Sequence, residues 1–65
     1  MNLVDYYVVE VLSNPVYHIH GKENFSWWEV KVSYYYDNGE LKEKVLTFDS
    51  EEEARQVQKG YHFTA

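Results

Sequence analysis

The sequence predicts an α+β fold in which a three- to four-stranded antiparallel β-meander packs against one C-terminal α-helix, within a single domain spanning residues 1–65. Two observations support this prediction. Apolar and polar residues alternate with a period of two through residues 27–36, which is typical of a half-buried strand. After Phe48 the apolar period becomes helical, which indicates a helix that covers one face of the sheet.

Three segments have the composition of strands. Tyr6 to Leu12 is rich in β-branched and aromatic residues and predicts the first strand. Trp27 to Tyr36 predicts the second, with its even-numbered residues facing the core, and Leu41 to Phe48 predicts the third. Between the first two, Val16 to His20 lies among turn residues, and both a strand extension and an ordered loop remain open for it.

The turn at residues 37–39, Asp-Asn-Gly, is the strongest hairpin signal in the chain. A two-residue loop would pair Val32 with Val45, whereas a three-residue loop ending on a left-handed glycine would pair Val30 with Leu46. We favour the second register because it buries the larger apolar residues of the third strand. The outer face would then carry Glu43, Val45 and Thr47.

The C-terminal helix should begin after Ser50 as N-cap, with Glu53 as its capping-box partner, and should end at Gly60. Residues 61–63 are expected to fold back against the sheet as a short edge strand. The apolar stripe of the helix would be formed by Ala54, Val57 and Tyr61.

Negative charge is concentrated in one segment. The chain has 11 acidic residues against six lysines and arginines, and seven of the acids fall between residues 37 and 53, beside only Lys42 and Lys44. A surface of this kind attracts cationic partners and repels nucleic acid and anionic membranes. We expect it to bind a protein with a basic surface. The acidic candidates for that contact are Asp37, Glu40, Glu43, Glu51, Glu52 and Glu53.

The aromatic content is high, with two tryptophans, seven tyrosines and three phenylalanines, and a domain of 65 residues cannot bury them all. Trp27 and Tyr35 fall on the face opposite the core and are the expected apolar anchors for a partner. Alternatively, residues 14–25 fold over Trp27 as a small second core. Stacking of single-stranded bases is disfavoured because such sites combine aromatics with a basic groove.

The sequence carries no catalytic signature, so we expect no enzyme activity and no cofactor. His18 and His20, with His62 or Glu23, are a weak metal signal because the chain has no cysteine, and ordinary surface histidines are expected instead. No apolar run is long enough to span a membrane, and the N-terminus lacks a signal-peptide pattern. A soluble protein in the cytoplasm of a bacterial host is therefore expected.

Residues 27–63 resemble small early proteins of phages and mobile elements of Gram-positive bacteria. The likeness lies in two strands joined by a tight turn, the helix start FDSEEEA at residues 48–54 and the ending GYHF at residues 60–63. This resemblance implies a stoichiometric inhibitor of a host nucleic-acid machine or defence system, as anti-CRISPR and anti-restriction proteins are. No functional residue is carried over from the resemblance, because these proteins share a biological setting rather than a site motif.

The resulting hypothesis is a small acidic interaction module that binds and inhibits a basic nucleic-acid-processing or defence protein, its carboxylates imitating the phosphates of a nucleic acid. The alternative is a homodimeric structural or regulatory protein that pairs through a sheet edge or its outer face. A single-stranded nucleic-acid-binding module is the least favoured reading.

Overall fold

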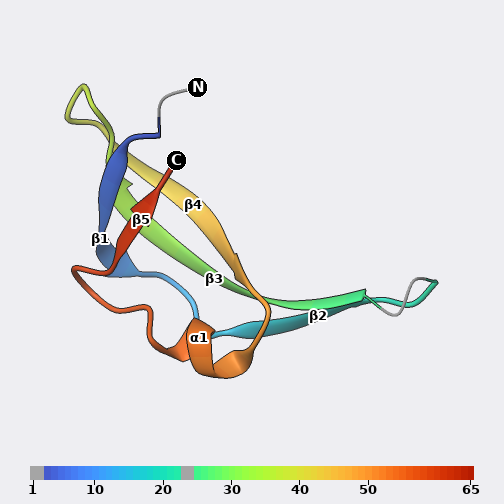
Figure 1. Ribbon diagram of the computed structural model, residues 1–65. Coiled ribbons are helices and arrows are strands. Elements are labelled where there is room, and N and C mark those ends of the chain that lie inside the picture. Colours follow the sequence, from blue (N-terminus) through green and yellow to red (C-terminus); the bar gives the residue numbers. More distant parts are fainter. Residues whose placement is uncertain (1–2, 23–24) are drawn as a thin grey trace.

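The computed structural model describes residues 3–22 and 25–65. Within them the chain is mostly antiparallel β-sheet, with five strands and one short helix, and is broadly α+β (Figure 1). The elements, in chain order, are β1 (Asp5–Val11), β2 (Val16–His20), β3 (Phe25–Tyr35), β4 (Leu41–Phe48), α1 (Glu51–Arg55) and β5 (His62–Thr64).

Strand β3 organises the sheet because it has partners on both edges. Its pairs with β4 run from Trp28 to Tyr35 along one edge. The other edge is shared by β2, which pairs with the first five residues of β3, and by β1, which pairs near Tyr34. Strand β5 then covers the free edge of β1, where Tyr6 pairs with Phe63.

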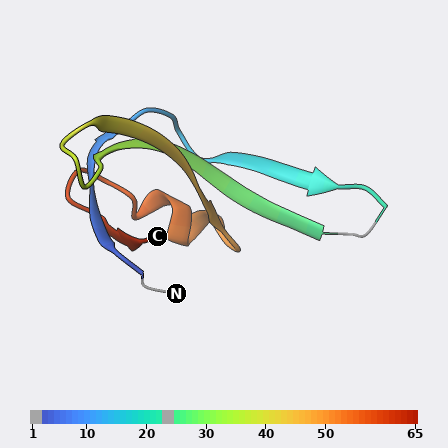
Figure 2. The same cartoon turned by 90° about the horizontal axis from the view of Figure 1, so that it is seen from above.

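The hairpin formed by β2 and residues 25–29 of β3 projects from the rest of the molecule, and we call it the arm (Figures 1 and 2). It contributes to an elongated shape whose extents are 40 × 27 × 16 Å. A two-stranded hairpin is marginally stable by itself. Aromatic cross-strand contacts support the arm, including Tyr17 against Trp28 at 5.2 Å between ring centroids.

The core lies on the inner face of the bent sheet and is built around Tyr6. The Tyr6 ring lies 5.0 Å from that of Tyr34 and 5.7 Å from that of Phe63, so aromatic packing joins β1, β3 and β5. Trp28, Phe48 and Tyr61 pack against this core while partly exposed. Its buried members are Tyr6, Val8, Val30, Val32, Tyr34, Leu46, Ala54, Val57 and Phe63.

The predicted register of the β3–β4 hairpin is confirmed. Val30 pairs with Leu46 and Trp28 with Phe48, and Gly39 takes the left-handed conformation with φ of 83°. The even-numbered residues of β3 from Val30 to Tyr34 are buried, as expected. Val45 on the outer face is 46% exposed.

The predicted strand count and connectivity are wrong. The described residues form five strands rather than three or four, because Val16–His20 pairs with the start of β3 and His62–Thr64 pairs with β1. The sheet is not a simple meander, since β1 lies between β3 and β5. This arrangement depends on the end of the chain, which pairs with β1 as the short edge strand that the sequence suggested.

The predicted extent of the helix is also wrong. Ser50 is the N-cap, and its hydroxyl accepts a hydrogen bond from the Glu53 amide at 3.2 Å, but α1 ends at Arg55 instead of Gly60. The reason is competition from β1: the Gly60 amide donates to the Val8 carbonyl at 2.8 Å, which requires the chain to leave the helix early. Val57 and Tyr61 still meet the core, from outside the helix.

Candidate functional site

The predicted contact residues separate into two groups, one at each end of β4. Tyr35, Asp37, Glu40 and Glu43 lie around the β3–β4 turn, whereas Trp27 and Glu51 to Glu53 lie where β4 leads into α1. At about 3.3 Å per residue, the eight residues of β4 separate the two groups by roughly 23 Å.

At the turn, Tyr35 pairs directly with Leu41, and each is 59% exposed. Directly opposite residues in a sheet point to the same side, so the two side chains form one apolar contact surface. The acids Asp37, Glu40 and Glu43 follow closely along the chain. We call these five residues the hairpin-end patch. Sequence reasoning identified Tyr35 but missed Leu41, although the favoured register already placed the two opposite each other.

The three acids of the patch have different environments. The Glu43 carboxylate lies 3.1 Å from the Lys31 ammonium group in an exposed ion pair. Asp37 accepts a long hydrogen bond of 3.4 Å from the Tyr6 hydroxyl. Glu40 is exposed and takes part in no ion pair among the described residues. Glu40 is therefore the acid most available to a cation from outside.

The Tyr6 hydroxyl links the patch to the core. Burial raises the pKa of Tyr6 above its usual value, and the negative charge of Asp37 adds to the effect. Tyr6 consequently stays neutral and can donate to Asp37 throughout the physiological range. This contact connects the turn that carries the acids to a buried aromatic ring of the core.

The two lysines of the acidic segment do not neutralise its outer face. Lys42 pairs with Tyr34 and Lys44 with Val32, so both lysines start from the inner face of the sheet, opposite to Glu43. The Lys42 ammonium group lies 4.2 Å from the centre of the Tyr36 ring, a cation–π distance. Among the acids of the hairpin-end patch, Glu43 thus starts from the opposite side of the sheet to these two cations.

At the other end of β4, the acids belong to the first turn of α1. Glu51 pairs with Arg55, the Oε1 and Nε atoms being 3.3 Å apart. Glu52 and Glu53 are exposed, and neither takes part in an ion pair among the described residues. Glu52 and Glu53 therefore remain open to an external cation, whereas Glu51 is already engaged.

Trp27 is half-buried and held within the arm. Its indole N–H donates to the Glu29 carboxylate at 2.7 Å, and the other oxygen of that carboxylate lies 3.1 Å from His18 Nε2. The His18 ring stacks on the indole at 5.5 Å with an interplanar angle of 9°, and the Phe25 ring lies 5.5 Å away. Of the two alternatives for Trp27, these contacts agree better with the one in which residues 14–25 pack on its ring.

Trp27 and Tyr35 do not form one aromatic patch, because seven residues of β3 separate them. Ser33 is an odd-numbered residue between them, so the predicted alternation places it on the outer face, but it is only 3% exposed. Its hydroxyl donates to the carbonyl of Glu10 at 3.4 Å, since β1 lies alongside β3 at this point.

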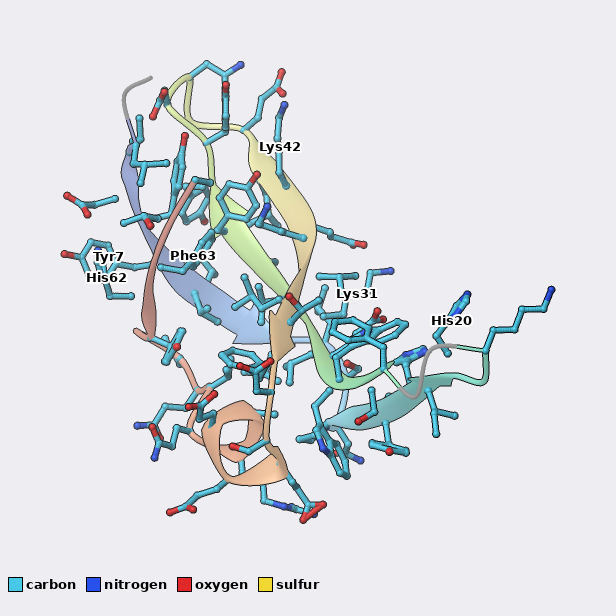
Figure 3. The ribbon with its side chains drawn as sticks, turned by 45° about the vertical axis from the view of Figure 1, so that its right-hand side comes forward. Tyr7, His20, Lys31, Lys42, His62 and Phe63 are labelled. Atoms are coloured by element: carbon cyan, nitrogen blue, oxygen red, sulfur yellow. The ribbon has the colours of Figure 1, made fainter. Side chains whose placement is uncertain are left out.

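The histidines are dispersed. His62 lies beside Tyr7 where β5 meets β1, with its Nε2 2.7 Å from the Asp5 carboxylate, whereas His20 lies on the arm (Figure 3). Glu23, the other residue of the metal alternative, is outside the described residues. Residues 3–22 and 25–65 contain no group of three or more histidine or carboxylate side chains that could hold a metal ion.

Comparisons with protein-family models, with curated proteins and with solved structures find no match to this chain. Among the residues that the structure describes, no helix is long and apolar enough to cross a membrane.

Proposed function

We propose that this protein is a small acidic interaction module that binds and inhibits a nucleic-acid-processing or defence protein through a basic surface on that partner. The setting would be the cytoplasm of a bacterial host. The inhibitor would occupy a surface that otherwise receives nucleic-acid phosphates, and it would need neither catalysis nor a cofactor.

The observation that carries this proposal is the hairpin-end patch. Tyr35 and Leu41 expose an apolar pair on the outer face, where Glu43 follows two residues along β4, and Asp37 and Glu40 lie in the adjoining turn. Such a combination suits a partner that presents an apolar pocket bordered by lysine or arginine side chains. The desolvated aromatic would supply most of the affinity, and the carboxylates would set orientation and association rate.

The size of the outer face is compatible with a single partner. A standard interface buries about 800 Å² on each protein, which corresponds to a patch roughly 30 Å across. The two acidic ends of β4 fall within that width. The helix-end acids Glu52 and Glu53 would therefore add to the attraction of the same basic surface.

The test is affinity capture from bacterial lysate at low and moderate salt, with bound proteins identified by mass spectrometry and then assayed for nucleic-acid cleavage or binding. Glu40→Lys tests the patch. Glu10→Lys is its matched control, because Glu10 is also exposed and the net charge changes equally, but it lies on β1 outside the acidic segment.

The proposal predicts one basic nucleic-acid-acting protein that is inhibited in a dose-dependent way and released as salt rises. Glu40→Lys should weaken capture and inhibition, and Glu10→Lys should leave both near the original level. Equal effects of the two variants would show that only net charge matters. Capture of a partner without a basic surface would refute the proposal.

A homodimer is the second candidate, and the arm is the observation that favours it. Val16, Tyr17, Ile19 and Phe25 are between 47% and 63% exposed, on a hairpin whose β2 edge has no partner strand among the described residues. A second copy would cover this surface and support the arm. Light scattering over a range of concentrations decides the matter: a monomer throughout excludes the homodimer.

A further inference from the structure

A cavity of about 330 Å³ opens where the arm, the end of β4 and the start of α1 meet, and we call it the arm cavity. It is larger than a single water site and suits one side chain. Its walls combine aromatic rings with two carboxylates, and no part of it belongs to the hairpin-end patch. The lining residues are Phe25, Trp27, Thr47, Phe48, Asp49 and Glu53.

The sheet register explains why a space opens here. Trp28 pairs with Phe48, the last residue of β4, so continuing the register would place Asp49 opposite Trp27. The chain instead turns at residues 49–50 and enters α1. Trp27 therefore has the His18 ring stacked on it from the β2 side, while the β4 side lacks a paired strand residue.

Trp27 can offer a ligand its ring face but not its N–H. The indole N–H is already engaged by Glu29 at 2.7 Å, and the same carboxylate is anchored by His18. A ligand in the arm cavity would thus meet a fixed aromatic surface, with Phe25 close by. Aromatic faces attract cations through their electron-rich π systems.

The carboxylates of the arm cavity also favour a positively charged ligand. Asp49 and Glu53 are exposed, and neither takes part in an ion pair among the described residues. Glu43 and Glu51, in contrast, are matched by Lys31 and Arg55. Two unpaired acids beside aromatic rings favour a cation that both stacks and donates hydrogen bonds.

We propose that the arm cavity binds a guanidinium group, the side chain of an arginine on the protein partner. A guanidinium is flat, so it can stack on Trp27, and it has five N–H donors for Asp49 and Glu53. A quaternary ammonium would make cation–π contacts with the rings but has no N–H group to donate to the carboxylates. A lysine ammonium would satisfy the carboxylates but offers no plane for stacking.

This inference rests on the proposed function for the identity of the partner, but the arm cavity can be tested without one. The ¹⁵N-labelled protein is titrated with N-acetyl-L-arginine amide at constant ionic strength, and resonances are followed by two-dimensional NMR. N-acetyl-L-citrulline amide is the uncharged analogue of the same shape, and N-acetyl-L-lysine amide is the non-planar cation.

The arginine probe should give saturable shifts at the Trp27 indole N–H and at the amides of residues 47–49 and 53, with an affinity in the millimolar range. Citrulline should bind at least about tenfold more weakly, and lysine should fall between them. The double variant Asp49→Asn, Glu53→Gln should lose at least about tenfold in affinity. Glu52→Gln, which removes one exposed carboxylate of the same helical turn outside the arm cavity, is the control and should bind as before.

Trp27→Leu provides a second test, because it removes the ring while leaving both carboxylates. Affinity for the arginine probe should fall to about the level of the lysine probe, with the spectrum of the β1 and β5 residues unchanged. Equal binding of arginine and citrulline, equal losses in the double variant and in Glu52→Gln, or shifts centred on Glu40 would overturn the assignment.

The outcome is distinguishable from that of the proposed function. A negative titration removes the arginine site whatever the affinity capture returns. A positive titration combined with capture of no basic partner refutes the proposed function and leaves the arginine site standing.

Discussion

The packing of Val30 gives the sharpest quantitative test of the fold. Val30 is 1% exposed and pairs with Leu46, whereas Val45 is 46% exposed and pairs with Lys31 on the opposite face. Changing each valine to alanine removes the same two methyl-sized groups and causes a similar loss of strand propensity. The difference between the two variants therefore isolates burial and, with it, the register.

Two methyl-sized groups are worth about 0.8 kcal/mol each when buried, and the cavity that remains adds to this cost. Val30→Ala should lower the free energy of unfolding by about 2 kcal/mol. Val45→Ala should lower it by less than about 1 kcal/mol, because its side chain is half-exposed and solvent fills the space. A domain of this size has roughly 3–10 kcal/mol in total, so both variants should remain folded.

Urea unfolding monitored by circular dichroism and tryptophan fluorescence measures both values. With a slope of about 1 kcal/mol/M, the midpoint should fall by about 2 M for Val30→Ala and by less than about 1 M for Val45→Ala, at unchanged slope. Equal midpoints for the two variants would refute the register, since a one-residue slip exchanges the inner and outer faces.

Three further predictions concern the cap, a turn and a buried hydroxyl. Ser50→Ala should lower the free energy of unfolding by about 1 kcal/mol in the same urea assay, because the Glu53 amide loses its acceptor; no loss would contradict the cap. Gly39→Ala should lower it by about 1 kcal/mol because φ is 83°, whereas Gly21→Ala, where φ is not left-handed, should change it little. The raised pKa of Tyr6 means that its stabilising effect is complete below pH 10.0 and declines as pH rises further. As pH rises from about 9 to 11, the free energy of unfolding should therefore fall less in Tyr6→Phe than in the original protein. An equal fall in both proteins would contradict this account.

The hairpin was predictable because its information is local. Alternation along residues 27–36 identifies the buried face, and the preference for burying Leu46 and Phe48 selects the three-residue turn, with Gly39 left-handed, that pairs Val30 with Leu46. Neither inference needs knowledge of the rest of the chain. Alternation also places Tyr35 on the outer face, but Leu41 was missed as its neighbour although the same register pairs the two.

The helix and the cavity depended on distant contacts and could not be read from spacing. The stripe of Ala54, Val57 and Tyr61 fits a longer helix, but the Gly60 amide bonds to the Val8 carbonyl, fifty-two residues away in the sequence. The arm cavity likewise requires β3 to extend beyond β4 while the chain turns at Asp49. Asp49 and Phe25 were therefore missed as possible contact residues.

The pairing of β1 with β5 has a consequence for the order of folding. Tyr7 and His62 pair across fifty-five residues, whereas Tyr35 and Leu41 pair across six. Closing the longer loop costs roughly 2 kcal/mol more in chain entropy, so the β3–β4 hairpin should form early and β5 should dock late. A contact made after the transition state mainly controls how fast the native protein opens. The pairing of β1 with β5 would then govern the lifetime of the folded state, while the β3–β4 hairpin would govern how quickly that state is reached.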